Sequence, residues 1–388
     1  MDFNFDEIIN RKGTNSIKWN SSQDGVLPMW VADMDFKTAP VVIEALQRRV
    51  DHGIFGYTET PPEFYSAIAN WWIQRHDFAL HPTWIVPAIG ILPALSAAIR
   101  ALTQTGEKVI VQSPVYNHFY DTVASCKRTL VENKLAYTDG RYHMNLEDLD
   151  LKTADPAVKL LIISNPHNPV GRVWSENDLR QLGDICIKNE VVVISDEIHS
   201  DLIHFGFKHV PFASLGEMYS KQSVTLASPS KTFNLAGLQV GYVFTENAEF
   251  RNDIKKVLVL QEMELLSPFA IEALISAYHG GGAWLDALKT YLFANYLHLK
   301  AFFAEHVPAV KVMSLESTYL VWLDLSFLSK SAIEISEELL ERSGLWINPG
   351  DMYGEAGAGF VRINIACPKS LLNQGLQKMK AYLDQQNY

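Results

Sequence analysis

Four short apolar runs in the middle of the chain constrain its fold most. They read KVIVQ (108–112), KLLII (159–163), EVVVI (190–194) and SVTLA (223–227), each with apolar side chains at consecutive positions. Successive side chains of a β-strand point to opposite faces, so a run without alternation predicts a strand covered on both faces. We therefore expect these runs to form the centre of a mostly parallel sheet.

Helical patterns separate the four runs. Residues 176–189, ENDLRQLGDICIKN, place Leu179, Leu182 and Ile185 on one face of a helix, with Cys186 beside them. Strands that alternate with such patterns from about residue 84 are typical of an α/β sheet with crossover helices. The sequence therefore predicts a doubly wound α/β fold.

The two ends of the chain have a different pattern. Helical patterns at 41–50 and 283–306 are accompanied by the strand-like stretches TYLVWLDL and FVRINIA and by a predicted amphipathic helix at Ala332–Arg342. These segments predict a second, smaller α+β unit built from both termini. We place the small α+β domain at residues 1–50 with 285–388, and the large α/β domain at residues 51–284.

Composition limits the classes of ligand. A chain of 388 residues that is 48% hydrophobic can bury a large core and divide into two domains. Its formal net charge of −11, without a Lys/Arg-rich run, argues against nucleic acid and anionic membrane surfaces. We expect a small-molecule ligand.

Compartment and metal content are predicted from what the sequence lacks. Three well-separated cysteines show no spacing typical of a disulfide framework or a zinc site, so no metal is expected. The stretch MDFNFDEIIN lacks a basic, then apolar, signal-peptide pattern, and no apolar run approaches the ~20 residues of a membrane span. These features predict a cytoplasmic protein.

Polar side chains follow all four predicted strands. Ligands of open α/β sheets bind beyond the carboxyl ends of the strands, so these residues are predicted to meet in one crevice. Each alone has an ordinary explanation, such as a core aromatic, a turn amide, a helix cap or a surface cation. The set is harder to explain that way, because a buried lysine and a buried aspartate each cost free energy. The residues are Tyr116 after the first run, Asn168 after the second, Asp196 and His199 after the third, and Ser228, Ser230 and Lys231 after the fourth.

A phosphate site is predicted at residues 85–102, IVPAIGILPALSAAIRAL. This stretch reads as a strand, a glycine and a helix that has proline in its first turn. Backbone N–H groups of Gly90, Ile91 and Leu92 could approach a phosphate there, aided by the helix dipole.

An amine, a carboxylate, an aromatic ring and a phosphate cradle together fit pyridoxal 5′-phosphate. This cofactor forms a Schiff base with a lysine, needs an acidic partner for its pyridine nitrogen and is anchored through its phosphate. Lys231 and Asp196 would meet the first two needs. Without the negative charge of Asp196, a carbanion at the substrate Cα would be poorly stabilised.

Segments throughout the chain resemble one enzyme family. The sequence is similar to the fold type I pyridoxal-phosphate enzymes of the class I/II aminotransferase superfamily, and within it to the MalY/PatB-type cystathionine β-lyases (C-S lyases). DEIH, where many aminotransferases have D-x-x-Y, favours the lyase branch. The resemblance implies an aspartate aminotransferase-like fold. The matching segments are PMWVADMDF (28–36), FGYT (55–58), SPVY (113–116), NPHNPVGRVW (165–174), SDEIHSDL (195–202), SKTFNLAGLQ (230–239) and FVRINIACPK (360–369).

The resemblance also implies roles for the cofactor-binding residues. Lys231 would carry the Schiff base and shuttle the Cα proton, with Asp196 and Tyr116 as the other catalytic residues. Asp196 would pair with the pyridine nitrogen, and Tyr116 would stack on the ring. Asn168 would hydrogen-bond the ring O3′, with His199 nearby. The phosphate contacts would come from Gly90, Ile91, Leu92, Ser228 and Ser230, and from Tyr57 of a neighbouring subunit.

Substrate binding and assembly follow from the same resemblance. Arg362 would bind the substrate α-carboxylate as a bidentate pair, with Asn168 and Tyr57 also near the substrate. A Tyr57 that crosses between subunits implies a homodimer with shared active sites. One position departs from the pattern: Gln239 stands eight residues after Lys231, where many relatives have Arg or Lys. A positively charged side chain that would contact the phosphate is therefore replaced by a neutral amide.

The implied reaction is β-elimination of cystathionine or a related cysteine S-conjugate to a thiol, pyruvate and ammonia. An aminotransferase is the alternative, because both reactions begin with Cα deprotonation. A regulatory binding protein with residual lyase activity is a second alternative, since some relatives contact a transcription regulator. Trp30 and Tyr319 are predicted candidates for an apolar wall around the substrate side chain.

Overall fold

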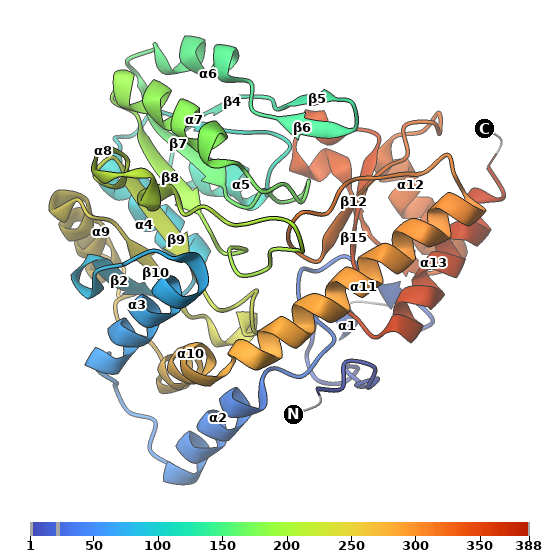
Figure 1. The fold of residues 1–388 in the computed structure, drawn as a ribbon, viewed down its shortest axis with the longest axis horizontal. Coiled ribbons are helices and arrows are strands. Elements are labelled where there is room, and N and C mark those ends of the chain that lie inside the picture. Colours follow the sequence, from blue (N-terminus) through green and yellow to red (C-terminus); the bar gives the residue numbers. More distant parts are fainter. Residues whose placement is uncertain (1–2, 21–23, 387–388) are drawn as a thin grey trace.

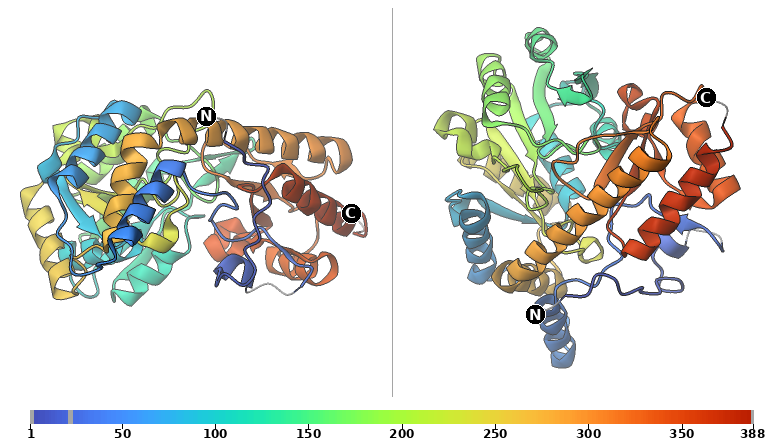
Figure 2. Two further views of the ribbon diagram at one scale, coloured as in Figure 1. Left: turned by 90° about the horizontal axis from the view of Figure 1, so that it is seen from below. Right: turned by 45° about the vertical axis from the view of Figure 1, so that its right-hand side comes forward.

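The computed structural model describes residues 3–20 and 24–386. Two sheets organise it, a seven-stranded sheet and a four-stranded sheet, with the long helix α11 (Gly282–His306) running from one towards the other (Figure 1). Figure 2 shows the helices of the smaller, C-terminal unit packed beside the strands of that unit. This arrangement confirms the predicted α/β fold class.

The seven-stranded sheet contains all four apolar runs. Strand β10 runs antiparallel to both of its neighbours, and the other adjacent pairs are parallel. The sheet is therefore mostly parallel, as predicted. Its order is β2 (Ile85–Ala88), β10 (Gly241–Phe244), β9 (Ser223–Ala227), β8 (Val192–Asp196), β7 (Val158–Ser164), β3 (Lys108–Val111) and β4 (Thr129–Glu132).

Helices cover both faces of this sheet, which explains the uninterrupted apolar runs. In β3, Val109 packs in one apolar cluster and its neighbour Ile110 in another on the opposite face. Each strand residue thus loses contact with water whichever way it points. One face is covered by α4 (Ile91–Leu102), α5 (His118–Ser125) and α9 (Ala248–Leu260), and the other by α3 (Pro62–His76), α6 (Leu146–Thr153) and α7 (Glu176–Lys188).

The third strand begins two residues later than its apolar run. EVVVI predicts a strand over 190–194, but β8 spans Val192–Asp196. Helix α7 ends at Lys188, and Glu190 has a φ of 56°, so the chain is still reversing direction there. Asp196 is therefore the last residue of the strand rather than part of the following loop.

The four-stranded sheet is antiparallel and is formed by strands from the C-terminal part of the chain. The predicted helix Ala332–Arg342 is α-helical only as α12 (Ala332–Glu338), and it continues as a π-helical turn at Leu339–Ser343. The sheet order is β11 (Lys311–Val312), β12 (Leu320–Asp324), β15 (Phe360–Asn364) and β14 (Asn348–Pro349), with α11 and α13 (Lys369–Leu383) packed together beside it.

The N-terminal segment joins this smaller unit. Strand β1 (Leu27–Pro28) pairs in parallel with β13 (Leu345–Trp346), which brings the two ends of the sequence together. The domain limits at 50/51 and 284/285 remain predictions, and α11 passes through position 284 without a break. The remaining elements are α1 (Ile17–Asn20), α2 (Pro40–His52), α8 (Glu217–Ser220), α10 (Pro268–Gly280) and the hairpin of β5 (Ala136–Thr138) and β6 (Arg141–His143).

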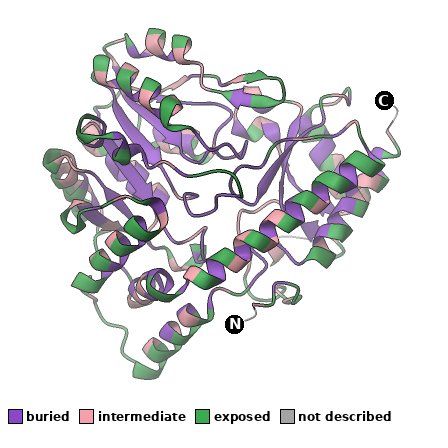
Figure 3. Ribbon diagram, viewed as in Figure 1, coloured by how far each residue is buried: buried purple, intermediate pink, exposed green. Residues whose placement is uncertain are grey.

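Burial is concentrated in the strands of both sheets and in the loops between them, whereas the surface helices expose one side (Figure 3). In the described residues, the helices are too short or too polar to cross a membrane. The buried loops between the sheets contain most of the polar side chains predicted to form a site.

Candidate active site

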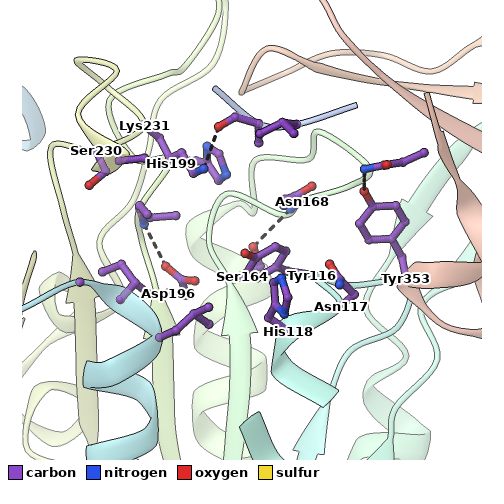
Figure 4. Close-up of a pocket in the computed structure, with 18 of the residues that line it drawn as sticks. Tyr116, Asn117, His118, Ser164, Asn168, Asp196, His199, Ser230, Lys231 and Tyr353 are labelled. Carbon is purple, nitrogen blue, oxygen red and sulfur yellow. Dashed lines mark hydrogen bonds between the residues drawn. The ribbon is translucent and has the colours of Figure 1, made fainter. Parts of the chain in front are cut away.

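A cavity of about 470 Å³ lies between the two sheets, at the carboxyl ends of the parallel strands. Figure 4 shows side chains from several strands pointing into it. Two predicted site residues, Ser228 and Tyr57, do not line it. Those that do are Gly90, Ile91, Leu92, Tyr116, Asn168, Asp196, His199, Ser230, Lys231 and Arg362.

Lys231 lies just past the end of β9 and extends its amine into the cavity. Its Nζ donates to Ala32 O at 2.7 Å. Burial lowers the Lys231 pKa to about 8, helped by the charge of Arg362 and opposed by Asp33 and Asp196. A neutral amine, which can act as nucleophile or base, is therefore abundant at mildly alkaline pH.

Asp196 ends β8 and is 4% exposed. Its Oδ1 accepts from Ile198 N at 3.1 Å. The Asp196 pKa is raised to about 7, mainly by burial and also by the adjacent Glu197, against the opposing effects of the Ile198 hydrogen bond and of Lys231. A cationic ligand group beside this carboxylate would lower the pKa again, so the site is suited to a protonated ring nitrogen.

Tyr116 and His199 are neutral side chains in the cavity wall. Burial raises the Tyr116 pKa to about 12, which keeps its phenol protonated. Burial lowers the His199 pKa to about 3, aided by Lys231 and Arg362. His199 Nδ1 is buried and has no hydrogen-bond partner among the described residues. Both groups are thus available to a ligand.

Arg362 enters the cavity from β15 of the other sheet. It is 4% exposed, and its Nη1 donates to Asn168 Oδ1 at 3.2 Å and its Nη2 to Trp30 O at 2.9 Å. The guanidinium also lies over the Tyr353 ring, 5.0 Å from its centroid. Its Nε finds no partner in the described part of the chain, so the group retains capacity for an anionic ligand.

The predicted phosphate end is formed by Gly90, Ile91, Leu92 and Ser230. Gly90 has a φ of 124°, in the region that favours glycine, and caps the N-terminus of α4. Ser228 lies behind Ser230, because its Oγ bonds Ser230 Oγ at 2.6 Å and Val240 O at 2.5 Å. Its direct contact with a ligand remains a prediction, whereas its support of Ser230 is observed.

Gln239 lines the cavity in a left-handed conformation, with a φ of 51°. Tyr57, in contrast, is 100% exposed and lies away from the cavity of its own chain. The predicted role of Tyr57 needs a second subunit and remains a prediction.

Several cavity residues were missed by the sequence analysis. Asn348 and Tyr353 line the cavity, and Asn348 Nδ2 donates to the Tyr353 hydroxyl at 2.9 Å. Ser164, the last residue of β7, and His118, the first residue of the helix α5 that follows β3, also line it. Ser164 and His118 could have been predicted because they lie close to the ends of predicted strands. No local sequence pattern marked Asn348.

A lysine, a carboxylate and an arginine gathered between a mostly parallel sheet and a smaller antiparallel sheet are the features of one enzyme family. The family model for aminotransferase class I and II matches residues 25–379, and the chain belongs to this family. The predicted family is confirmed.

More specific similarities are to carbon-sulfur lyases. Cystathionine beta-lyase PatB of Bacillus subtilis is 43% identical over 385 residues, covering 98% of this chain and 100% of the relative. Protein MalY of Escherichia coli is 34% identical over 381 residues, covering 96% of this chain and 97% of its own.

A solved structure supports the same grouping. The PLP-bound C-S lyase from Staphylococcus hominis has a TM-score of 0.93 to this chain at 33% identity, with 100% of each chain covered. The aspartate aminotransferase-like fold predicted from the resemblance is therefore confirmed.

Proposed function

We propose that this protein is a pyridoxal-phosphate-dependent C-S β-lyase, which cleaves cystathionine or a related cysteine S-conjugate to a thiol, pyruvate and ammonia. The convergence of Lys231, Asp196 and Arg362 in one cavity carries this proposal. The similarity to PatB, MalY and the Staphylococcus hominis C-S lyase supports the lyase reaction over other reactions of the family.

The cavity residues fit the cofactor. His199 Nδ1 and Arg362 Nε are buried polar atoms without partners in the described chain, which is expected where a polar ligand belongs. The Asp196 pKa of about 7 indicates a carboxylate without an adequate cationic neighbour, which a protonated pyridine nitrogen would provide. Lys231 Nζ would attach the cofactor, and Tyr116 would contact its ring.

The phosphate would be held by uncharged groups. Backbone N–H groups at Gly90, Ile91 and Leu92 lie at the start of α4, where the helix dipole favours an anion. Ser230 adds a hydroxyl, and Gln239 adds an amide in place of a cation. Tyr57 from a second subunit would complete the set.

The chemistry supplied by bound pyridoxal phosphate is that of an electron sink for the pair left when the Cα proton is removed. Arg362 binds the substrate α-carboxylate and thereby orients the Cα–H bond towards Lys231. Lys231 Nζ, neutral above its pKa of about 8, accepts the proton at Cα.

Rupture of the C–S bond then releases a thiolate, which a proton converts to the thiol. Water hydrolyses the remaining three-carbon unit to pyruvate and ammonia, so atoms and charges balance. Asp196 would stay ionised beside the ring nitrogen and would keep that nitrogen protonated.

Incubation with L-cystathionine in the absence of a keto acid tests the proposal. We expect pyruvate from the wild-type protein and none from Lys231→Ala, which also loses the visible absorption band of the bound cofactor. Amino transfer to an added keto acid without pyruvate formation would instead identify an aminotransferase, the alternative within this family.

We also infer a homodimer and a cytoplasmic location. The segment that carries Tyr57 is unusually apolar for a surface, with Ile54 66% and Phe55 53% exposed, which supports burial against a second copy. The free thiols of Cys126 and Cys186 are typical of a reducing compartment. Sedimentation at assay concentration tests the dimer, and a fully active monomer would contradict it.

A further inference from the structure

One backbone oxygen near the cavity accepts hydrogen bonds from two distant side chains. Lys231 Nζ donates to Ala32 O at 2.7 Å, and the Tyr319 hydroxyl donates to the same oxygen at 2.9 Å. Ala32 belongs to the N-terminal segment, Tyr319 directly precedes β12 and Lys231 follows β9. The lysine amine and the tyrosine hydroxyl are thus linked through a single carbonyl.

Tyr319 is held rigidly in this position. It is 1% exposed, and its own carbonyl accepts from Ile365 N at 2.9 Å. Burial and the charge of Asp33 hold the pKa of Tyr319 well above its usual range, so the hydroxyl keeps its proton and remains a donor. Tyr319 does not itself line the cavity: its ring lies edge-on to that of the cavity residue His199, with 6.4 Å between centroids, and its hydroxyl reaches Lys231 through the Ala32 carbonyl.

The peptide around Ala32 is fixed on both sides. Asn364 Nδ2 donates to Val31 O and to Asp33 O, each at 2.6 Å. With its neighbours held by β15 and its own oxygen held by Tyr319, the Ala32 carbonyl has a defined direction. It therefore offers Lys231 one preferred position.

We propose that Tyr319 is a positioning residue that fixes the Ala32 carbonyl as the resting place of the Lys231 amine whenever that amine is free. This inference rests on the proposed function, in which the free amine removes the Cα proton. A lysine side chain is long and flexible. A fixed hydrogen-bond acceptor therefore reduces the number of Lys231 side-chain conformations from which the amine cannot take up the Cα proton. An N–H bond to Ala32 also leaves the nitrogen lone pair free to accept the proton.

Tyr319→Phe tests the proposal, with Tyr296→Phe as a matched control. Tyr296 is also buried in the smaller unit and donates to a backbone carbonyl, Met313 O at 3.2 Å, but its bond has no link to Lys231. Both substitutions keep the aromatic ring and remove one hydroxyl. Melting temperatures of the two holoenzymes check that both variants are folded.

We expect kcat to fall about tenfold in Tyr319→Phe with KM nearly unchanged, because Arg362 still binds the carboxylate. With cystathionine deuterated at the reacting Cα, the isotope effect on kcat should increase, since proton transfer becomes slower relative to other steps. Tyr296→Phe should match the wild type in both measurements.

A second measurement needs no turnover. Apoprotein mixed with pyridoxal phosphate should develop the visible band several-fold more slowly in Tyr319→Phe than in Tyr296→Phe, because the amine is less often in place. If Tyr319→Phe equals the control in kcat, isotope effect and band formation, the inference is wrong while the proposed function stands. If the wild-type protein develops the visible band but forms no pyruvate, the proposed lyase function is wrong. The rate of band formation in Tyr319→Phe and Tyr296→Phe still tests the role of Tyr319 in that case.

Discussion

Asn348 and Arg362 lie directly opposite each other in the antiparallel pair of β14 and β15, and both donate to the carbonyl oxygen of Trp30. The distances are 3.1 Å from Asn348 Nδ2 and 2.9 Å from Arg362 Nη2. The Trp30 ring is in turn stacked on Trp346 at 4.6 Å. The N-terminal segment and the arginine are therefore held in one arrangement.

Asn348→Ala should weaken substrate binding. Without the amide, Trp30 O loses one donor and the Tyr353 hydroxyl loses its partner, so Arg362 is less firmly held. We expect KM to rise about five- to tenfold, which corresponds to roughly 1 kcal/mol for the lost hydrogen bond to Trp30 O, with a smaller change in kcat. Steady-state kinetics with L-cystathionine measure both. Asn295→Ala, which removes bonds to Ile365 O and Cys367 O away from the cavity, should leave KM unchanged.

Thr232→Val should loosen the loop that carries Lys231. The Thr232 hydroxyl donates to Asp201 Oδ2 at 2.8 Å, and Asp201 also accepts from Trp71 and His76. A buried carboxylate that loses a donor costs about 1–3 kcal/mol. We expect faster dissociation of pyridoxal phosphate, followed by absorbance after dilution, together with a lower melting temperature.

Thr245→Val is the control for that experiment. Thr245 is buried, and its hydroxyl donates to Ser223 O at 2.7 Å. This hydrogen bond involves neither Lys231 nor the loop that carries it. It should lose comparable stability without a change in cofactor dissociation. Equal dissociation rates in the two variants would show that Thr232 has no specific effect on the site.

Asp196→Asn should stabilise the apoprotein at alkaline pH while it abolishes activity. The pKa of Asp196 is raised to about 7 in the folded protein from 3.8, so folding is opposed by its charge above pH 7 and not below pH 4. We expect a gain of roughly 2–4 kcal/mol in the free energy of unfolding at pH 8 and almost none at pH 4. Denaturant unfolding of the apoprotein at the two pH values measures this, and an equal effect at both would contradict it.

Gln239→Arg should tighten cofactor binding. Gln239 lines the cavity near the predicted phosphate end and already has a φ of 51°, so arginine adds a charge without a new backbone requirement. A charge-assisted bond of about 1.5–3 kcal/mol predicts at least tenfold tighter binding of pyridoxal phosphate. Equilibrium titration of the apoprotein measures the affinity. Gln239→Met, similar in size but without a donor, should bind more weakly than the wild type.

The central sheet and half of the site were predictable because their signals are local. An apolar run such as SVTLA becomes a strand wherever both of its faces are covered, and β9 matches that run residue for residue. Polar residues after parallel strands share one edge, so Lys231, Asn168 and Tyr116 meet as expected. The strand limits of β8 were less predictable, because the turn after α7 decides where pairing begins.

What the sequence by itself determined is the fold class and the chemistry at the strand ends, since both depend on periodicity and on the order of neighbouring residues. The tertiary structure alone decided which distant groups support that chemistry. Asn348 meets Arg362 only through antiparallel register, and Tyr319 reaches Lys231 only through the carbonyl of Ala32. Such contacts depend on how the two sheets pack on either side of the cavity, and no spacing of residues along the chain encodes that packing.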